Sequence, residues 1–446
     1  MAVLTLILSV FLLWSCAQER VPEESLPLDT RDNYVEALHQ LDLADTALGR
    51  GWLEAGEQAV RQPVDMEAPL EEVVIVEAHR PAAVGYRFPA RRGRRITIEI
   101  ESDMDRFFAD VYRDDDQLTP VASLHGSSGE ITFEPQRDNH YILRLQPELL
   151  RDGRFTLRFV AAAALHFPVE GVGEERIYSF FGDPRDGGRR IHEGVDIFAP
   201  RGTPLLATSD AVVFRVGWRD RGGNIVSLRD TTRDLMIYYA HLDEQLVVEG
   251  QRVSAGDVIG TVGNTGNART TPPHLHIGVY QGSWRNAVDP WDYFVDPPVT
   301  TPVAVSPRRV ESLGRWYVLD SPLSADTRIP VVAMAPRFIN RNPFLHLGPA
   351  VRSATGLLEG PEPDYQQTTL PVGTAVQVVG VSGDHVRLRT EAGEAWVTTL
   401  PQLEQLASVQ PQEERLAAAA ATAPATAVTV GSRRLVTDTG NADVEM

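Results

Sequence analysis

The sequence predicts a mainly β, multidomain protein. At 446 residues the chain is too long for one ordinary core. From about residue 70 onward, apolar and polar residues alternate with a period of two, in short runs that end at Gly, Pro, Asp and Asn. A helical period is found only before residue 62. We therefore expect short N-terminal helices followed by several β domains.

The first 16 residues have the form of an export signal. The apolar run "LTLILSVFLLWS" ends at Cys16, the single cysteine of the chain, and is too short to span a bilayer comfortably. The stretch "LWSC" resembles a bacterial lipoprotein box, in which cleavage of the signal exposes a cysteine that is lipidated. We expect residues 1–16 to be a lipoprotein signal peptide ending at lipidated Cys16; an ordinary cleaved signal is the alternative.

A lipid anchor at Cys16 implies a location in the cell envelope. We expect a membrane-anchored lipoprotein facing the periplasm of a Gram-negative cell, with the outer membrane favoured over the inner. A thick-walled cell is the alternative.

Residues 30–62 form the expected helical segment. Val35, Leu38 and Leu41 are spaced as on one face of an amphipathic helix. We expect Gly49 and Gly51 to break the segment into a helical pair that serves as a stalk or packs on a neighbouring domain.

Residues 70–163 predict a β-sandwich of jelly-roll type. The alternation in "RRITIEIESD" directs Ile96, Ile98 and Ile100 to one face, as in a strand with one buried side. We expect a spacer domain; carbohydrate or peptidoglycan binding is the alternative.

Residues 166–297 carry the chemistry. "HEGVDIFAP" begins like the helical zinc motif H-E-x-x-H, but Asp196 stands in place of the second histidine. Gly194 and the β-branched residues after it predict a loop that enters a strand, so His192 and Asp196 must meet by bending of the backbone. Glu193 then has no reason to be a general base, and we expect it to be solvated or to support the site indirectly.

Three further histidines accompany this stretch. His274 and His276 are two residues apart in a strand pattern, so both side chains project from one face. His241 follows the strand-like run "LMIYYA". Two histidines and a carboxylate with one open position make a catalytic zinc site, whereas a structural site would be closed by a fourth ligand, usually with cysteine. Cysteine is absent here, which favours the catalytic type.

The runs "HEGVDIFAPRGTP", "YYAHL", "GQRVSAGDVIGTVGNTG" and "PHLHIGV" resemble the lysostaphin or LytM-type zinc endopeptidases, which cut peptide bridges in bacterial peptidoglycan. The likeness covers about 130 residues and implies an all-β peptidase domain. It implies that His192, Asp196 and His276 bind Zn²⁺ and that His241 and His274 are the catalytic pair.

A second function is compatible with the same resemblance. Some relatives keep the fold, lose the ligands and activate a separate cell-wall amidase without catalysis of their own. The complete ligand set of this chain favours the enzyme over such a regulator.

Departures from the family pattern concern the surroundings of the predicted metal. The segment "TTPPHLH" has Pro272 where a glycine-rich approach is common, Gly278 replaces an acidic residue, and "RDTTRDLM" replaces a short turn. These positions shape the groove and hence the specificity of cleavage. The glycine-rich hairpin also resembles biotinyl and lipoyl carriers, but the chain has no lysine to carry such a group.

The remaining segments are a linker, a small domain and a tail. Residues 298–309 are rich in proline and predict a linker. Residues 310–405 resemble a bacterial Src-homology-3-like barrel, which often binds wall peptides; a second barrel within 310–350 is an alternative. Residues 406–446 are rich in Ala and Thr, and we expect a disordered tail.

Charge limits the partners. Against 42 basic residues, all of them arginine, stand 61 acidic ones, which gives a net charge of −19. This excess argues against nucleic acid as a partner. The expected partners are peptidoglycan peptides and, through Cys16, a membrane. An anionic substrate would need a local site to hold it.

Overall fold

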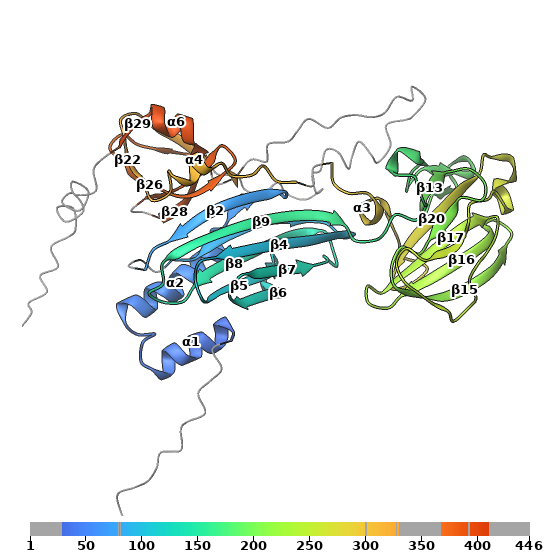
Figure 1. The fold of residues 1–446 in the computed structure, drawn as a ribbon, viewed down its shortest axis with the longest axis horizontal. Coiled ribbons are helices and arrows are strands. Elements are labelled where there is room, and N and C mark those ends of the chain that lie inside the picture. Colours follow the sequence, from blue (N-terminus) through green and yellow to red (C-terminus); the bar gives the residue numbers. More distant parts are fainter. Residues whose placement is uncertain are drawn as a thin grey trace, which may run out of the picture.

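A computed structural model describes residues 29–298 apart from 79 and 81, and then 301–326, 328–329, 367–390 and 393–409 (Figure 1). Strands predominate over helices and form several sheets, so the expected mainly β fold class is confirmed. Cys16, most of the segment in which a second barrel is an alternative, and the tail beyond residue 409 lie outside the described residues. In the described part of the chain, no helix is long and apolar enough to cross a membrane.

Two helices open the described chain: α1 (Arg31–Gln40) and α2 (Ala47–Arg61). The expected break at Gly49 and Gly51 is wrong, because both glycines lie inside α2. The chain instead turns before Thr46, whose side chain caps α2 by accepting a hydrogen bond from the Gly49 N–H at 3.0 Å. Gly49 allows this tight turn, since a Cβ there would lie 2.0 Å from the Leu43 carbonyl oxygen.

The next strands are β1 (Val64–Met66), β2 (Leu70–Val76), β3 (Val84–Ala90), β4 (Arg94–Ser102), β5 (Phe107–Arg113), β6 (Thr119–Gly126), β7 (Gly129–Phe133), β8 (Asn139–Pro147) and β9 (Gly153–Ala163). They form two layers, one with the order β1-β3-β8-β5-β6 and the other with the order β2-β9-β4-β7. Ile96, Ile98 and Ile100 on β4 are at most 2% exposed and enter the core between the layers, as their alternation predicts.

The C-terminal elements are β22 (Trp316–Leu319), β23 (Leu323–Asp326), β24 (Arg328–Ile329), β25 (Gln367–Leu370), β26 (Ala375–Ser382), β27 (His385–Thr390), β28 (Gly393–Thr399), α6 (Leu400–Gln405) and β29 (Ala407–Val409). These strands do not form a sheet of their own. Strand β26 pairs antiparallel with β2, and β24 pairs parallel with β1, so both layers of the sandwich continue into this region. The segment before it, expected as a linker, includes the short helix α4 (Pro307–Val310).

A buried ion pair reinforces this junction. Arg387 on β27 donates two hydrogen bonds of 3.0 Å to the two carboxylate oxygens of Glu72 on β2. The two residues are 3% and 1% exposed. The Arg387 guanidinium also lies 4.6 Å from the ring centre of Tyr86. The C-terminal strands are therefore fastened to the sandwich by a paired charge in the interior.

The segment between these parts forms a separate sheet with the order β10-β13-β20-β17-β16-β15-β18. Its strands are β10 (Ile177–Ser179), β13 (Val195–Phe198), β15 (Ala211–Arg219), β16 (Gly223–Asp230), β17 (Leu235–Leu242), β18 (Arg252–Val253) and β20 (His274–Gln281). Shorter elements complete it: β11 (Pro184–Arg185), β12 (Arg190–Ile191), β14 (Pro204–Leu206), β19 (Val258–Thr261), β21 (Ala287–Val288), three single 3₁₀ turns and α3 (Trp291–Phe294). No long helix occurs in this described segment, as its residue pattern predicts.

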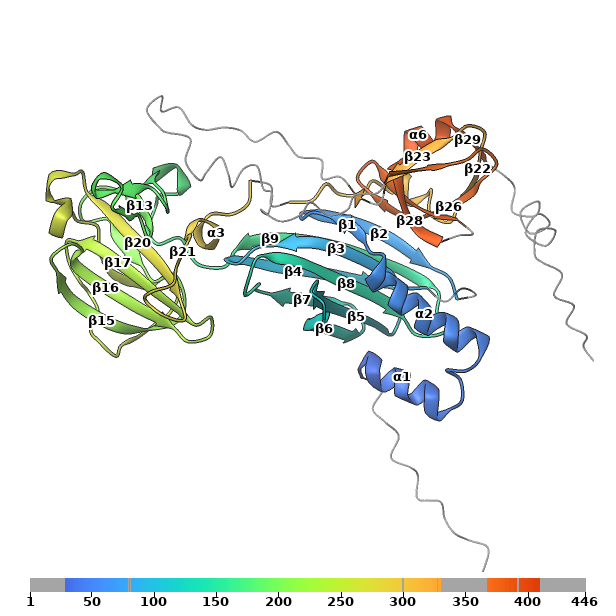
Figure 2. The same ribbon diagram turned by 180° about the vertical axis from the view of Figure 1, so that it is seen from behind.

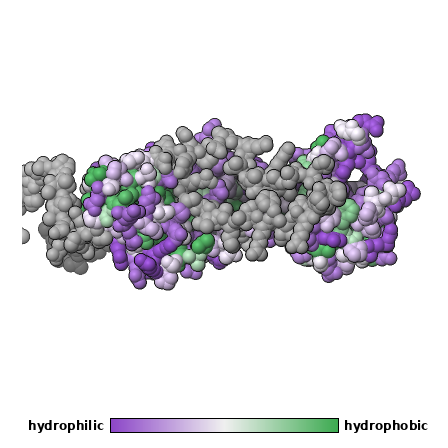
Figure 3. Space-filling model, turned by 90° about the horizontal axis from the view of Figure 1, so that it is seen from above, coloured by the Kyte–Doolittle hydropathy of each residue, from purple (hydrophilic) through white to green (hydrophobic). Residues whose placement is uncertain are grey.

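This sheet unit adjoins one end of the sandwich (Figure 2). Arg94 on β4 forms an ion pair with Asp292 on α3 and donates to the Val295 carbonyl oxygen. A second contact joins Arg233, between β16 and β17, to Glu134, which follows β7: the guanidinium donates to the two carboxylate oxygens at 2.6 and 2.9 Å. The face seen in Figure 3 is mainly hydrophilic on both lobes, with small apolar patches. Ion pairs thus contribute to the contacts between the two units.

Candidate metal centre

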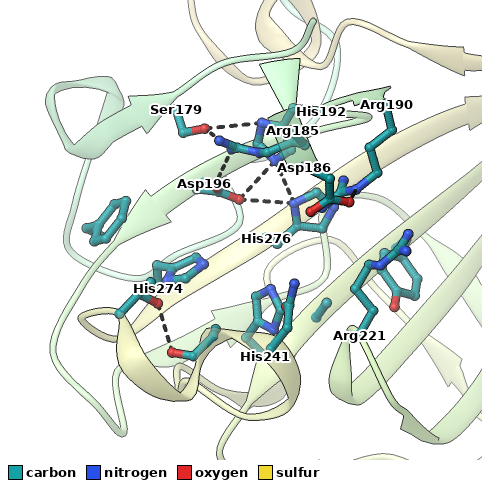
Figure 4. Close-up of a pocket in the computed structure, with 17 residues that line it drawn as sticks. Ser179, Arg185, Asp186, Arg190, His192, Asp196, Arg221, His241, His274 and His276 are labelled. Carbon is teal, nitrogen blue, oxygen red and sulfur yellow. Dashed lines mark hydrogen bonds and ion pairs between the residues drawn. The ribbon is translucent and has the colours of Figure 1, made fainter. Parts of the chain in front are cut away.

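Three ligand atoms converge at the edge of strand β13. The distances are 2.9 Å from His192 Nε2 to His276 Nδ1, 3.0 Å from His276 Nδ1 to Asp196 Oδ1, and 3.1 Å from His192 Nε2 to Asp196 Oδ1 (Figure 4). Tetrahedral coordination with bonds of about 2.1 Å would place such atoms about 3.4 Å apart. The three side chains therefore fit one metal ion after small shifts.

The sheet and one loop explain this convergence. Asp196 on β13 lies directly opposite His276 on the antiparallel strand β20. His192 precedes β13 in a loop held by hydrogen bonds of 2.8 Å between its backbone and that of Gly182 and Asp183. Gly194 lets the loop pass close to β20, because a Cβ there would lie 2.4 Å from the Ile277 carbonyl oxygen. The bend expected between His192 and Asp196 is therefore present.

Hydrogen bonding fixes the tautomer of His192. Its Nδ1 lies 2.9 Å from the Phe180 carbonyl oxygen, which can only accept, so Nδ1 carries the proton. The lone pair of Nε2 then faces Asp196 and His276. A carbonyl that orients the far nitrogen in this way is the usual support of a metal-binding imidazole.

Asp196 is ionised in this environment. Burial by itself raises the pKa of its carboxyl, but the neighbouring His192 and His276 imidazoles outweigh burial and hold the pKa well below its usual range. Burial lowers the pKa of His276, which Asp196 opposes. Asp196 is therefore a carboxylate, and burial favours the neutral form of His276, which are the protonation states that metal ligands require.

The second oxygen of Asp196 is also held. Arg185 on β11 donates to Oδ2 at 3.0 Å and also contacts the Ser179 hydroxyl. This arginine was not singled out by the sequence pattern. The one sequence feature that could have indicated Arg185 is its position shortly before His192, in the β11–β12 hairpin.

The other two predicted histidines lie beside the triad. His241, at the end of β17, donates from Nδ1 to the Thr265 carbonyl oxygen at 2.9 Å. His274, at the start of β20, donates from Nδ1 to the Pro272 carbonyl oxygen at 2.9 Å. Their ring centres are 5.0 Å apart. Both imidazoles thus keep the Nε2 lone pair free to accept a proton.

The backbone of His241 is in an uncommon conformation. Its φ is +66°, in the left-handed region, and its N–H donates to the Gly222 carbonyl oxygen at 2.7 Å. Burial, together with the charges of His274 and His276, lowers the pKa of His241 to about 4. The imidazole is therefore neutral near pH 7.

These five residues line a cleft of about 480 Å³. Its other walls are formed by Ser179, Arg185, Asp186, Arg190, Phe198, Arg221, Gly222, Tyr238, Ala240, Asn267, Ala268 and Thr271. Glu193 is not among them: it is exposed and lies 3.5 Å from the Tyr280 hydroxyl. The cleft therefore combines a possible metal triad with two potential bases, and Glu193 is outside it.

An aromatic row continues from the cleft over the face of the sheet. The Tyr238 ring lies 6.1 Å from that of His276 and 6.3 Å from that of Trp284. The Phe214 ring lies a further 6.3 Å from Trp284. Trp284 and Phe214 are exposed, so the row offers aromatic rings for contact beside the cleft.

Comparison with known proteins identifies a family for the region that contains the cleft. Residues 190–290 match Peptidase family M23. Over 137 residues, 28% of this chain and 42% of the relative, the chain is 42% identical to an L-Ala–D-Glu endopeptidase of Bacillus subtilis. Over 141 residues, 30% of this chain and 32% of the relative, it is 42% identical to peptidoglycan DD-endopeptidase ShyC of Vibrio cholerae. The chain thus spans less than half of the length of these two relatives.

A solved structure gives a further match. The catalytic domain of lysostaphin from Staphylococcus simulans is 34% identical, with 26% of this chain and 87% of that chain covered and a TM-score of 0.24. All five residues predicted from the sequence for the metal and the catalytic pair lie within the stretch that matches the family. Residues 190–290 of this chain are therefore a domain of Peptidase family M23.

Proposed function

We propose that this protein is a zinc-dependent endopeptidase that hydrolyses peptide cross-links of bacterial peptidoglycan. The observation that carries the proposal is the convergence of His192, Asp196 and His276 within 2.9 to 3.1 Å in a cleft that also contains His241 and His274. The two relatives described above cut peptide bonds, and ShyC is a peptidoglycan endopeptidase by name.

The donor set supports zinc as the metal. Two imidazoles and one carboxylate leave a fourth position open, which is the composition of catalytic zinc sites. His192 Nε2, His276 Nδ1 and Asp196 Oδ1 would hold the ion. When bound, zinc supplies Lewis acidity that polarises the scissile carbonyl and lowers the pKa of water.

The two remaining histidines would move the proton. His241 and His274 each have Nδ1 bound to a carbonyl oxygen, so Nε2 of either can accept a proton from the attacking water. Once protonated, the same nitrogen can donate to the leaving amine or to the oxyanion. His241 is neutral near pH 7 and is therefore ready for the first of these steps.

Digestion of purified peptidoglycan tests the function. A soluble form that lacks residues 1–16 is incubated with sacculi, with and without a zinc chelator, and released peptides are identified by mass spectrometry. We expect loss of cross-linked dimers that stops with the chelator and returns with zinc. A folded, zinc-loaded protein that releases nothing would contradict the enzyme and favour a regulator of a wall amidase, which a mixed assay with an amidase would reveal.

We also propose that the protein is anchored by lipid at Cys16 in the cell envelope, facing the periplasm, with the outer membrane favoured. The support is the apolar run that ends at "LWSC". Metabolic labelling with a palmitate analogue and membrane fractionation compare the natural chain with Cys16→Ser. Label and membrane association that persist in the variant would refute the anchor.

A further inference from the structure

The cleft is a local concentration of positive charge on an acidic chain. Of its lining residues, Arg185, Arg190 and Arg221 are cationic and Asp186 and Asp196 are anionic, whereas the whole chain carries a net charge of −19. The metal proposed above would add two further positive charges. Such a site attracts an anionic group that the rest of the surface repels.

Two of the three arginines already have carboxylate partners. Arg185 donates to Asp196 at 3.0 Å, and Arg190 donates to Asp186 at 2.6 Å. The Arg221 guanidinium, in contrast, makes no hydrogen bond or ion pair with any residue that the structure describes. It is exposed at the wall of the cleft, and its five N–H donors are available to a ligand.

The backbone that carries Arg221 is held firmly against the catalytic segment. The Arg221 carbonyl oxygen accepts from the Asn267 N–H at 3.0 Å, and that of the next residue, Gly222, accepts from the His241 N–H at 2.7 Å. A Cβ at Gly222 would lie 2.1 Å from the Tyr238 hydroxyl oxygen, so a larger residue there would displace the Tyr238 side chain. The turn between β15 and β16 therefore fixes the backbone of Arg221 beside that of His241.

The cleft has a charged end. Arg190, Asp186 and Arg221 lie together on one side of the triad, and His274 lies on the other (Figure 4). Arg221 is near enough to Asp186 for its charge to add to the Arg190 hydrogen bond in lowering the pKa of that carboxyl. At the opposite end the His274 ring stacks on Phe198, with ring centres 4.9 Å apart. A peptide lying across the triad would meet Arg221 at one end and the stacked rings of Phe198 and His274 at the other.

We propose that Arg221, with Arg190 beside it, binds a carboxylate of the substrate peptide next to the scissile bond. The inference rests on the proposed endopeptidase function and narrows its substrates to peptides with a free carboxylate at that place, in preference to neutral glycine bridges. A guanidinium matches a carboxylate with two parallel hydrogen bonds. The carboxylate can come from the C-terminus of the peptide strand or from the diamino acid of a cross-link.

Matched substrates and variants separate these cases. The zinc-loaded soluble form is assayed on directly cross-linked muropeptide dimers with the diamino-acid carboxylate free or amidated, and on uncross-linked pentapeptides with the C-terminus free or amidated. The variants are Arg221→Gln and, as the control, Arg219→Gln, which alters an exposed arginine two residues away that does not line the cleft. Zinc content and melting temperature show that the variants are intact.

The proposal predicts a specific pattern of kcat/KM. Amidation of the bound carboxylate lowers the value for the natural protein about tenfold, mainly through KM, since a hydrogen-bonded charge of this kind contributes roughly one such factor. In Arg221→Gln, kcat/KM falls by a similar factor on the substrate with the free carboxylate and does not change on the amidated substrate. Arg219→Gln has the same kcat/KM as the natural protein on both substrates. The pair of substrates that shows the effect identifies the source of the carboxylate.

Two results would overturn the inference: equal rates on acid and amide for the natural protein, or an equal loss on both in Arg221→Gln. If none of the four peptides is cleaved, the endopeptidase proposal fails instead. Calorimetric titration of the same four peptides into the zinc-loaded protein then tests the carboxylate proposal separately. Binding that requires both the free carboxylate and Arg221 would support the proposal without turnover. Binding that is the same for acid and amide, or the same in Arg221→Gln, would refute it, as would no binding.

Discussion

Arg185 holds the Oδ2 atom of Asp196 at 3.0 Å, while Oδ1 of the same carboxylate faces the two histidines of the metal triad. The carboxylate is thus used on both sides, and it cannot rotate without losing one set of contacts. This relationship makes Arg185 a positioning residue for the proposed metal.

Replacement of Arg185 tests that role. We expect Arg185→Gln to weaken zinc binding by about 10- to 100-fold, the usual effect of losing a residue that orients a ligand. Competition with a fluorescent chelator measures the affinity. Arg201→Gln is the control, because Arg201 is exposed and pairs with Asp243 outside the cleft. Equal affinities in both variants would contradict the positioning role.

The two kinds of site residue should respond differently to mutation. We expect Asp196→Ala to lose zinc and activity together, because a ligand atom is removed. We expect His274→Ala to keep most of the zinc but to lose at least about 100-fold in rate, since its nitrogen acts on protons and not on the metal. Bound zinc is measured by mass spectrometry and rate by peptide release. Loss of zinc from His274→Ala would place that residue among the ligands.

The low pKa of His241 has a consequence for stability. Burial and the neighbouring imidazoles lower it to about 4 in the folded protein, against an ordinary value near 6.5. The folded state therefore binds this proton more weakly than the unfolded state, and the stabilisation is present above pH 6.5 and lost as the pH falls toward 4. We expect the metal-free His241→Gln variant to lose less stability between pH 7 and pH 4.5 than the natural protein. Urea unfolding at both pH values measures this, and equal losses would refute it.

The buried pair between Glu72 and Arg387 should matter far more than an exposed one. We expect Glu72→Ala to destabilise the protein by roughly 3 kcal/mol, because it leaves the arginine charge buried without its carboxylate. The control is Glu99→Ala, which removes an exposed pair with Arg158 and should cost less than about 1 kcal/mol. Chemical denaturation compares the two variants, and similar losses would argue against a special role for the junction.

The aromatic row gives a prediction on intact wall material. We expect Trp284→Ala to weaken binding to sacculi several-fold, as truncation of an exposed aromatic contact commonly does, with zinc content unchanged. Trp218→Ala is the control, because Trp218 is also exposed but makes none of the ring contacts of the row. A pull-down with insoluble peptidoglycan measures binding. Equal binding by both variants would exclude the row from contact with the wall.

Local patterns indicated which elements carry the candidate ligands, and the family resemblance singled out the triad among them. Gly194 and the β-branched residues after it indicated a loop entering a strand, and the spacing of His274 and His276 indicated one face of a strand. Both features depend on residues close together in the chain, and the structure has both. The match in register between Asp196 and His276 across two strands is what brings them into one site.

Other parts of the site left no local signal. Because every basic residue of the chain is arginine, composition could not distinguish Arg185 or Arg221 from the rest. They reach the cleft only through the β11–β12 hairpin and the turn after β15. The predicted helix break at Gly49 is also misplaced: Gly49 lies in the first turn of α2, where the lack of a Cβ lets it approach the Leu43 carbonyl oxygen closely.

The pairing of β26 with β2 joins segments about 300 residues apart in the chain. The ion pair beside it, between Glu72 and Arg387 on β27, joins residues 315 positions apart. During synthesis, one edge of the sandwich is complete only when the far end of the chain arrives. Contacts of such long range form slowly, and until then the edge of β2 presents unpaired backbone groups to other chains. A chain cut short before residue 375 would lack β26 and leave this edge of β2 open, so we expect such a fragment to be prone to aggregation.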